Sequence, residues 1–201
     1  MKRYLCSNNV FVRFAALYAI GLVLFLIAWY VSYLFFPEGL LRGGSTAEKI
    51  VGDTAAASLF VEFSRIAVAN LILSLLIISG NSVLKINNYP LGYLIPLIWL
   101  INYGILLGTN SFMIPMEARL APSIVVLQRS GLYELAAFTF IAAATYPLSR
   151  YQIKKLFVTN PEKIEPGKRK PMKTLDKISL LIAIIILLGA NFWEAYMIMN
   201  V

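Results

Sequence analysis

Residues 10–36 read VFVRFAALYAIGLVLFLIAWYVSYLFF, an apolar stretch whose only charged residue is Arg13, near its start. A membrane-spanning helix needs about 20 consecutive apolar residues, so this stretch is long enough to cross a bilayer. A cleavable signal peptide has an apolar region of roughly 7–15 residues that ends in a small-residue cleavage site. The stretch is longer than that, has no such site and ends at the turn signal Phe36-Pro37-Glu38-Gly39. We therefore predict a retained membrane span.

Four further apolar stretches follow along the chain. Together with the first they predict five spans, at about residues 10–36, 58–80, 89–109, 131–148 and 178–200. The third span contains several prolines and glycines, so we expect its helix to be kinked or partly unwound. The stretch Asn110–Ser130 holds two prolines and a Glu–Arg pair, and we expect it to be interfacial or re-entrant. The predicted fold is an all-α polytopic membrane helical bundle, a single integral membrane domain over residues 1–201.

The composition agrees with a protein solvated by lipid. Hydrophobic residues make up 59% of the chain and charged residues 14%, whereas soluble domains carry about 25% charged residues. Cys6 is the only cysteine, which excludes an intrachain disulfide, and histidine is absent. The absence of histidine removes the commonest general base and zinc ligand, so we expect no metal, no cofactor and no enzymatic activity.

The basic residues predict an orientation in the cytoplasmic membrane. With the N-terminus inside and the C-terminus outside, thirteen basic residues fall in inner segments and four in outer ones, namely Arg42, Lys49, Arg119 and Arg129. This asymmetry follows the positive-inside rule and places the basic loop 150–177 in the cytoplasm. The loop has two interpretations: a docking site for a soluble partner or anionic lipid headgroups, or a topology anchor that is otherwise solvated. Nucleic-acid binding is not expected, because no aromatic stacking platform is interleaved with the basic residues.

Polar residues inside the predicted spans are the candidate functional residues. A lone charge near the bilayer centre costs about 2.5–3.5 kcal/mol, so such residues normally find a partner or water. The orientation puts the charged residues Glu62, Arg65, Glu134 and Glu194 in the outer half of the bilayer, where we expect one shared polar cluster with Arg65 as its counter-ion. The predicted members are Glu62, Arg65, Asn70, Asn102, Glu134, Asn191 and Glu194. The cluster is interpreted as a staple between helices or, alternatively, as a water-filled vestibule or ligand site.

Thr139 and Ala143 form a small-xxx-small pair in the fourth span. Such pairs permit close approach of helices and are compatible with a homodimer.

Three short elements resemble the stage II sporulation protein M family of polytopic membrane proteins. The element Asn102-Tyr103-Gly104, with Gly108 after it, looks like an Asn-Gly element of that family. Residues 129–137 read RSGLYELAA and resemble its Pro-His-Gly-x-x-Glu-Leu-x-Ala pattern at Gly131, Glu134, Leu135 and Ala137, without the proline and histidine. Residues 190–196 read ANFWEAY and look like an Ala-x-x-Glu-Ala element that includes Glu194.

The resemblance implies a noncatalytic membrane scaffold or assembly protein, because the founding member assembles peptidoglycan-degrading enzymes during engulfment. The expected partners are membrane lipids, other membrane or envelope proteins, and a second copy of the chain. The alternative is a transporter or channel component that handles a cation or small polar solute through the outer-leaflet cluster. A scaffold should co-purify with other proteins and show no flux alone.

Overall fold

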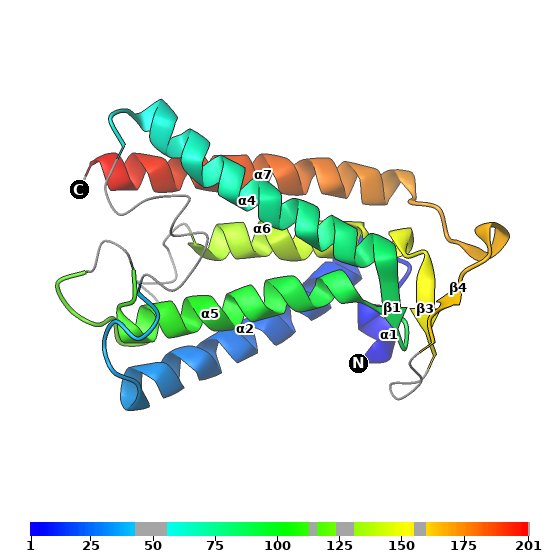
Figure 1. The fold of residues 1–201 in the computed structure, drawn as a ribbon, viewed down its shortest axis with the longest axis horizontal. Coiled ribbons are helices and arrows are strands. Elements are labelled where there is room, and N and C mark those ends of the chain that lie inside the picture. The colour runs from blue at the N-terminus through cyan, green and yellow to red at the C-terminus, as the bar shows by residue number, and fades with distance from the viewer. Residues whose placement is uncertain (43–55, 113–115, 124–130, 155–159, 201) are drawn as a thin grey trace.

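The computed structural model describes residues 1–42, 56–112, 116–123, 131–154 and 160–200. Its helices are α1 (Lys2–Leu5), α2 (Val10–Phe35), α4 (Leu59–Val83), α5 (Leu94–Thr109), α6 (Gly131–Ala144) and α7 (Thr174–Met199). The long helices lie side by side in an elongated bundle, and the two termini lie at opposite ends of it (Figure 1). Below, the end that carries the N-terminus is called the inner end and the other the outer end.

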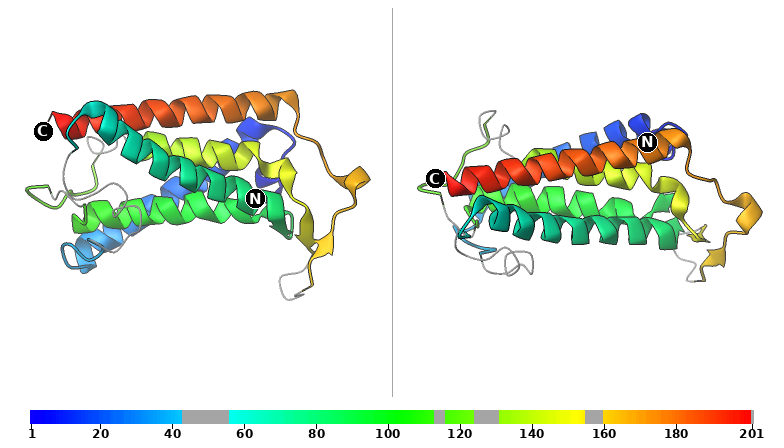
Figure 2. Two further views of the ribbon diagram at one scale, coloured as in Figure 1. Left: turned by 45° about the horizontal axis from the view of Figure 1, so that its top comes forward. Right: turned by 90° about the horizontal axis from the view of Figure 1, so that it is seen from above.

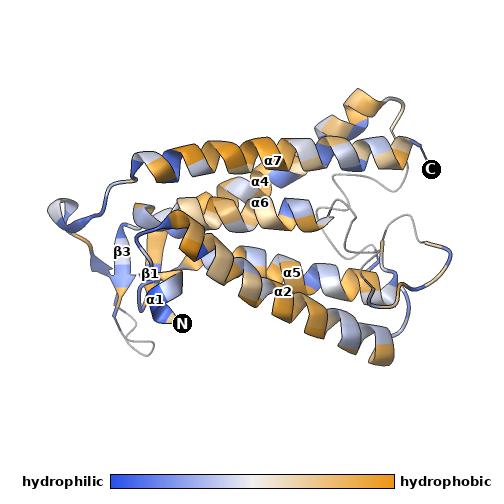
Figure 3. Ribbon diagram, turned by 180° about the vertical axis from the view of Figure 1, so that it is seen from behind, coloured by the Kyte–Doolittle hydropathy of each residue, from blue (hydrophilic) through white to orange (hydrophobic). Residues whose placement is uncertain are grey.

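Four described stretches are long and apolar enough to cross a membrane, as in a multi-pass membrane protein. They are Val10–Phe35, Leu59–Val83, Leu91–Thr109 and Thr174–Met199, and they coincide with the first, second, third and fifth predicted spans. Figure 3 shows that apolar residues dominate these helices. The fourth predicted span, residues 131–148, contains α6 of 14 residues and then the 3-10 turn η3 (Tyr146–Leu148). Residues 124–130, which precede α6, lie outside the described part.

The third predicted span is more regular than expected. Helix α5 runs without interruption from Leu94 to Thr109, so the expected unwinding of the third span is confined to residues 89–93, before the helix begins. Pro96 lies in its first turn, where the amide that proline lacks would have no helical partner. The irregular part is the 3-10 turn η1 (Leu91–Tyr93), which comes before the helix.

Two glycines of α5 allow it to lie directly against α2. A Cβ atom on Gly104 would lie 2.5 Å from the Phe25 carbonyl oxygen, and one on Gly108 would lie 2.8 Å from the Trp29 carbonyl oxygen. These residues are four apart and so share one helix face, as in the small-residue contacts of membrane helices. The glycines predicted to loosen the third span therefore fix its packing.

Helix α6 is the centre of the bundle. Every residue from Ala137 to Thr145 is buried, and the helix contacts α2, α4, α5 and α7. A helix that is apolar and buried on all sides is typical of the core of a large bundle. Thr139 and Ala143 are both fully buried, so this small-residue pair packs helices of the same chain and gives no support to a homodimer.

A small sheet at the inner end was not predicted. It comprises β1 (Leu84–Ile86), β2 (Tyr89–Pro90), β3 (Tyr151–Ile153) and β4 (Glu162–Lys163), in the order β2-β1-β3-β4. Strands β1 and β3 are parallel, with Lys85 opposite Gln152. The turn from β1 to β2 uses Asn87 and Asn88, both with positive φ, as type I′ two-residue hairpins require. The all-α description therefore holds for the long apolar helices but not for the inner end (Figure 2).

The stretch after α5 folds back over the outer ends of α2 and α5 in the part that is described. The Arg119 guanidinium donates to the carbonyl oxygens of Ser32 (2.9 Å), Tyr33 (2.7 Å), Phe36 (3.0 Å) and Gly108 (2.9 Å). These are carbonyls at the C-terminal ends of two helices, where the helix dipole attracts cations. Residues 113–115 and 124–130 of the predicted interfacial segment lie outside the described residues.

Candidate functional site

Five of the seven predicted polar residues lie together where α4, α6 and α7 meet towards the outer end. Glu134 lies in the first turn of α6, and Asn191 and Glu194 lie one turn apart on α7. Helix α4 contributes Asn70 and, two turns earlier, Glu62. Each helix presents these groups to the interface because the remaining faces of α4 and α7 are apolar and exposed. We call Glu62, Asn70, Glu134, Asn191 and Glu194 the carboxyl–amide cluster.

Hydrogen bonds connect the cluster across all three helices. The Asn70 side-chain amide donates to Glu134 Oε1 at 3.2 Å and to Asn191 Oδ1 at 2.7 Å. With its own amide turned over, Asn191 donates to Glu134 Oε1 at 2.8 Å instead. The carboxyl groups of Glu134 and Glu194 are hydrogen-bonded to each other. Two carboxylates have no hydrogen to share, so this contact requires a proton on one of them.

Glu62 is close enough to act on the cluster through its charge, but its own hydrogen bond is to the backbone before α4. Its side chain is 2% exposed and accepts a hydrogen bond from the Ala56 amide at 2.8 Å, just before α4 begins. A carboxylate at a helix N-terminus satisfies free amides and interacts favourably with the helix dipole. Its charge also acts on Glu194. Glu62 thus fixes the start of α4 and adds negative potential to the cluster.

Arg65 does not join the cluster. It forms no ion pair with a described residue, so the predicted pairing with Glu62 is not observed. Glu62 is turned into the bundle towards Ala56, whereas Arg65 lies half-buried in a shallow groove with Phe60, Ser64 and Val68 on the outside of α4. A residue two turns into a helix can extend its long side chain towards the membrane interface, so Arg65 needs no carboxylate there.

Asn102 is also separate from the cluster. It lies on α5, whose main contact is with α2, and it has no hydrogen-bond partner among the described residues. Its neighbour Tyr103 instead connects two of the resembling elements: the Tyr103 ring occupies the space that a Cβ on Gly131 would need. Gly131 is therefore required for the close approach of α6 to α5.

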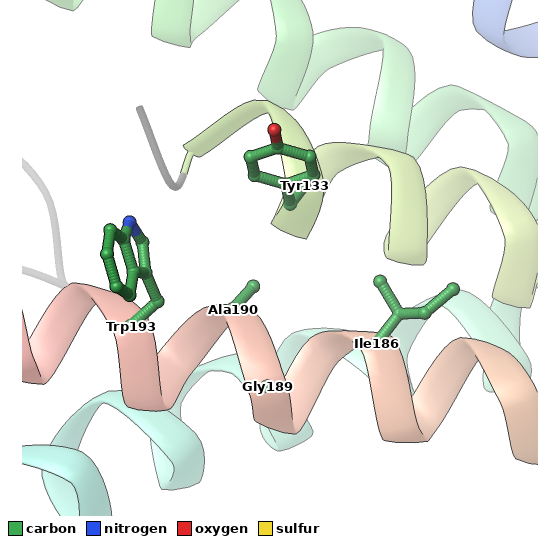
Figure 4. Close-up of a pocket in the computed structure, with 5 residues that line it drawn as sticks. All are labelled: Tyr133, Ile186, Gly189, Ala190 and Trp193. Carbon is green, nitrogen blue, oxygen red and sulfur yellow. The ribbon is translucent and has the colours of Figure 1, made fainter. Parts of the chain in front are cut away.

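A shallow groove runs along the outer surface beside the cluster. It has a volume of about 390 Å³ and is lined by Tyr133 on α6 and by Ile186, Gly189, Ala190 and Trp193 on α7 (Figure 4). Tyr133 and Trp193 each directly precede a glutamate of the cluster in sequence, and Ala190 precedes Asn191. The groove and the cluster therefore share the same helix turns, with the groove residues on the helix faces that adjoin the cluster.

The most buried ion pair of the described chain was not predicted. Arg13 and Asp176 lie at the inner end with side chains only 2% and 4% exposed, and their Nη2 and Oδ1 atoms are 2.6 Å apart. The sequence did contain a signal, because Arg13 is a charge inside an apolar stretch and Asp176 is an acid at the start of another.

The cluster contains hydrogen-bonded carboxyl groups, and no basic side chain within the described residues forms an ion pair with them. Among the described residues, no group of three or more His, Cys, Asp or Glu side chains is arranged to hold a metal ion. Fold and cluster together are those of a multi-pass helical bundle with a polar interior at one end. No protein-family model matches the sequence, and no curated protein or solved structure matches it.

Proposed function

We propose that this protein is a noncatalytic integral membrane scaffold that organises partner proteins in the cytoplasmic membrane. In this proposal the chain crosses five times, with α6 as the short fourth crossing, the N-terminus inside and the C-terminus outside. The observation that carries the proposal is the four-stranded sheet at the inner end, which gives a helical membrane protein a folded surface beyond its helices (Figure 2). A scaffold needs such a surface to hold soluble or peripheral partners.

The sheet is attached to the bundle by specific hydrogen bonds. Ser149 Oγ donates to the Asn81 carbonyl oxygen at 2.5 Å, and the Arg150 amide donates to the Ser82 carbonyl oxygen at 2.9 Å. Asn81 and Ser82 belong to the last turn of α4, so the strand that follows α6 is joined to the end of another helix. An attached surface with exposed polar residues such as Glu162 and Lys163 is suited to recognition.

Kinship with the stage II sporulation protein M family is part of the same proposal. The residues that carry the resemblance lie at helix contacts: Gly104 against α2, Gly131 against Tyr103, and Leu135 and Ala137 in the core. Glu134 and Glu194 carry the two acidic positions and are hydrogen-bonded to each other. The three resembling elements are far apart in sequence, but residues from them meet in the bundle. This supports the proposed kinship with the family.

Purification from native membranes tests the scaffold. The wild type should bring partner proteins with it, and Lys163→Glu, which reverses an exposed charge on β4, should lose some of them. Lys177→Glu is the matched control, because Lys177 is also exposed at the inner end but belongs to α7. The proposal fails if the wild type retains no more protein than an unrelated membrane protein of similar size.

The second candidate is a transporter or channel component for a cation or small polar solute. The specific observation in its favour is the hydrogen-bonded pair of Glu134 and Glu194 inside the bundle, since intramembrane carboxyl groups often relay protons. The purified protein in proteoliposomes should then show flux that Glu134→Gln abolishes. Absence of flux by the wild type, together with co-purified partners, favours the scaffold.

A further inference from the structure

Lys85 is a basic residue that forms no ion pair with any residue in the described part of the chain. It lies on β1, directly after α4, and its Nζ atom is 4.0 Å from the centre of the Tyr146 ring. The described ion pairs are Arg13–Asp176, Lys154–Glu162 and Lys168–Glu165, and none of them includes Lys85. Contact with an aromatic ring favours the ammonium group but does not neutralise it.

The surroundings of Lys85 add positive charge. Burial lowers the pKa of Lys85 to about 8; nearby Cys6 opposes this, and the charges of Lys170 and Arg13 lower the pKa further. Arg13 is compensated by Asp176, whereas Lys170 forms no ion pair with a described residue. A partly buried ammonium group that is repelled by its neighbours would be stabilised by a bound anion.

Three segments of the chain bring basic side chains to this place. Lys2 of α1 donates to Asn87 Oδ1 in the β1–β2 turn at 3.0 Å, which places the N-terminal segment next to β1. Lys170, from the segment before α7, donates to Asn8 Oδ1 at 3.1 Å. These neutral amide contacts position Lys2 and Lys170 without cancelling their charges.

The positive ends of two helices also lie here. The first turns of α2 and α7 are in contact through Arg13 and Asp176, so the two N-termini are adjacent. Helix N-termini carry partial positive charge and favour anions. Both helices are membrane-spanning stretches, so their first residues lie at the depth of the phospholipid headgroups.

We propose that Lys2, Lys85 and Lys170 form a binding site for the phosphate group of an anionic phospholipid of the inner leaflet. The apolar surface beside the site argues for a lipid over free phosphate: Met1 and Tyr4 are 79% and 56% exposed on the same N-terminal segment as Lys2. A headgroup would contact the lysines while apolar side chains of α1 face the interfacial region. The site does not depend on the scaffold role.

Lipid titration of the purified, delipidated protein, followed by native mass spectrometry, tests the site. Phosphatidylglycerol should bind more tightly than phosphatidylcholine, and Lys85→Gln and Lys170→Gln should each weaken phosphatidylglycerol binding about fivefold. Lys163→Gln, which removes an exposed charge from β4 on the same inner end, should bind like the wild type. Lys85→Arg, which keeps the charge, should retain most of the binding. Inorganic phosphate at the same concentration should not displace the lipid.

Each contrary result overturns the proposal. Equal affinity for the two lipids, or an equal loss in Lys163→Gln, means that general surface charge attracts the lipid and no site exists. Displacement by inorganic phosphate makes the occupant a free anion. If Lys85→Gln does not fold, Lys170→Gln decides the question, because Lys170 is exposed and its replacement removes no core contact.

Discussion

Arg13 in the first turn of α2 and Asp176 in the first turn of α7 form an ion pair across 163 residues of sequence. The guanidinium also donates to the carbonyl oxygens of Ala143 (3.0 Å) and Ser7 (2.7 Å). The second carboxylate oxygen of Asp176 accepts from the Lys173 amide at 3.0 Å. The pair thus joins α2, the end of α6 and the start of α7 with most of its hydrogen-bonding capacity used.

Replacing one partner of this pair should destabilise the protein strongly. Arg13→Leu leaves the Asp176 carboxylate buried without its counter-ion, and such losses are about 3–5 kcal/mol. The measurement is the thermal unfolding temperature in detergent. Lys154→Gln, which breaks the exposed pair with Glu162, is the control and should change stability little.

The double variant Arg13→Leu/Asp176→Leu extends this test. Removing both charges should recover much of the lost stability, because apolar side chains of similar size can replace a buried pair. If the double variant loses the sum of the two single losses, Arg13 and Asp176 are not energetically coupled.

Helix packing can be tested at two glycines, Gly104, which is packed against α2, and Gly189, which has open space beside it. Gly104→Ala adds a methyl group 2.5 Å from the Phe25 carbonyl oxygen, where α2 would have to move, and should cost about 1–3 kcal/mol of stability. Gly189→Ala is the control, because nothing lies within 4 Å of its Cβ position. Thermal unfolding of both variants decides. Equal unfolding temperatures for the two would show that α2 and α5 do not depend on close contact at Gly104.

The long helices could be predicted because each is encoded by a continuous apolar stretch of sequence. A run such as residues 10–36 needs no knowledge of the rest of the chain, and its end at Pro37 is a property of that residue. The strands could not be predicted in the same way. They are two or three residues long, and Lys85 is opposite Gln152 only because α4 and α6 end at the same level. Strands this short show no alternation of apolar and polar residues.

The sequence predicts how deep each polar side chain lies in the bilayer, but it does not predict whether that side chain faces the bundle or the lipid. The topology assigned Glu62, Glu134 and Glu194 to the same half of the bilayer. It also assigned Arg65 there, but only the rotation of α4 about its axis separates the inward Glu62 from the outward Arg65. Residues three apart lie on adjoining parts of a helix surface, so a small rotation decides which one faces the bundle.

The stability of the protein should depend on pH through Lys85. Burial lowers its pKa to about 8, below the value of 10.5 in an unfolded chain. Between these two pH values the unfolded state binds more protons than the folded state, so stability rises with pH across this window. Lys85→Met removes the group, and the wild type should therefore gain unfolding temperature relative to Lys85→Met from pH 8 to 10.5. A constant difference between the two proteins would contradict the lowered pKa.

Orientation can be tested by labelling single cysteines in a Cys6→Ser background. Lys168→Cys should be protected from a membrane-impermeant reagent in intact cells, because the basic residues favour the inner side for this segment. Glu117→Cys should be labelled, because Glu117 is exposed at the opposite end of the bundle. Labelling at position 168 but not at 117 would invert the proposed orientation.

The carboxyl pair gives the last prediction. A hydrogen bond between Glu134 and Glu194 requires one proton, and an amide side chain can supply the same donor. Glu134→Gln should therefore keep the contacts with Glu194 and Asn70 and unfold close to the wild-type temperature. Glu134→Leu has the same backbone but removes both contacts, and leaving polar groups unpaired costs about 1–3 kcal/mol.

Infrared spectroscopy shows whether Glu134 and Glu194 share a proton or are only packed against each other. The wild type should show the C=O stretch of a protonated carboxylic acid at neutral pH, and Glu134→Gln should lose it, because the new amide donates to a Glu194 carboxylate. If the band persists in Glu134→Gln, the protonated acid is not a carboxyl group of this pair, and the prediction is wrong.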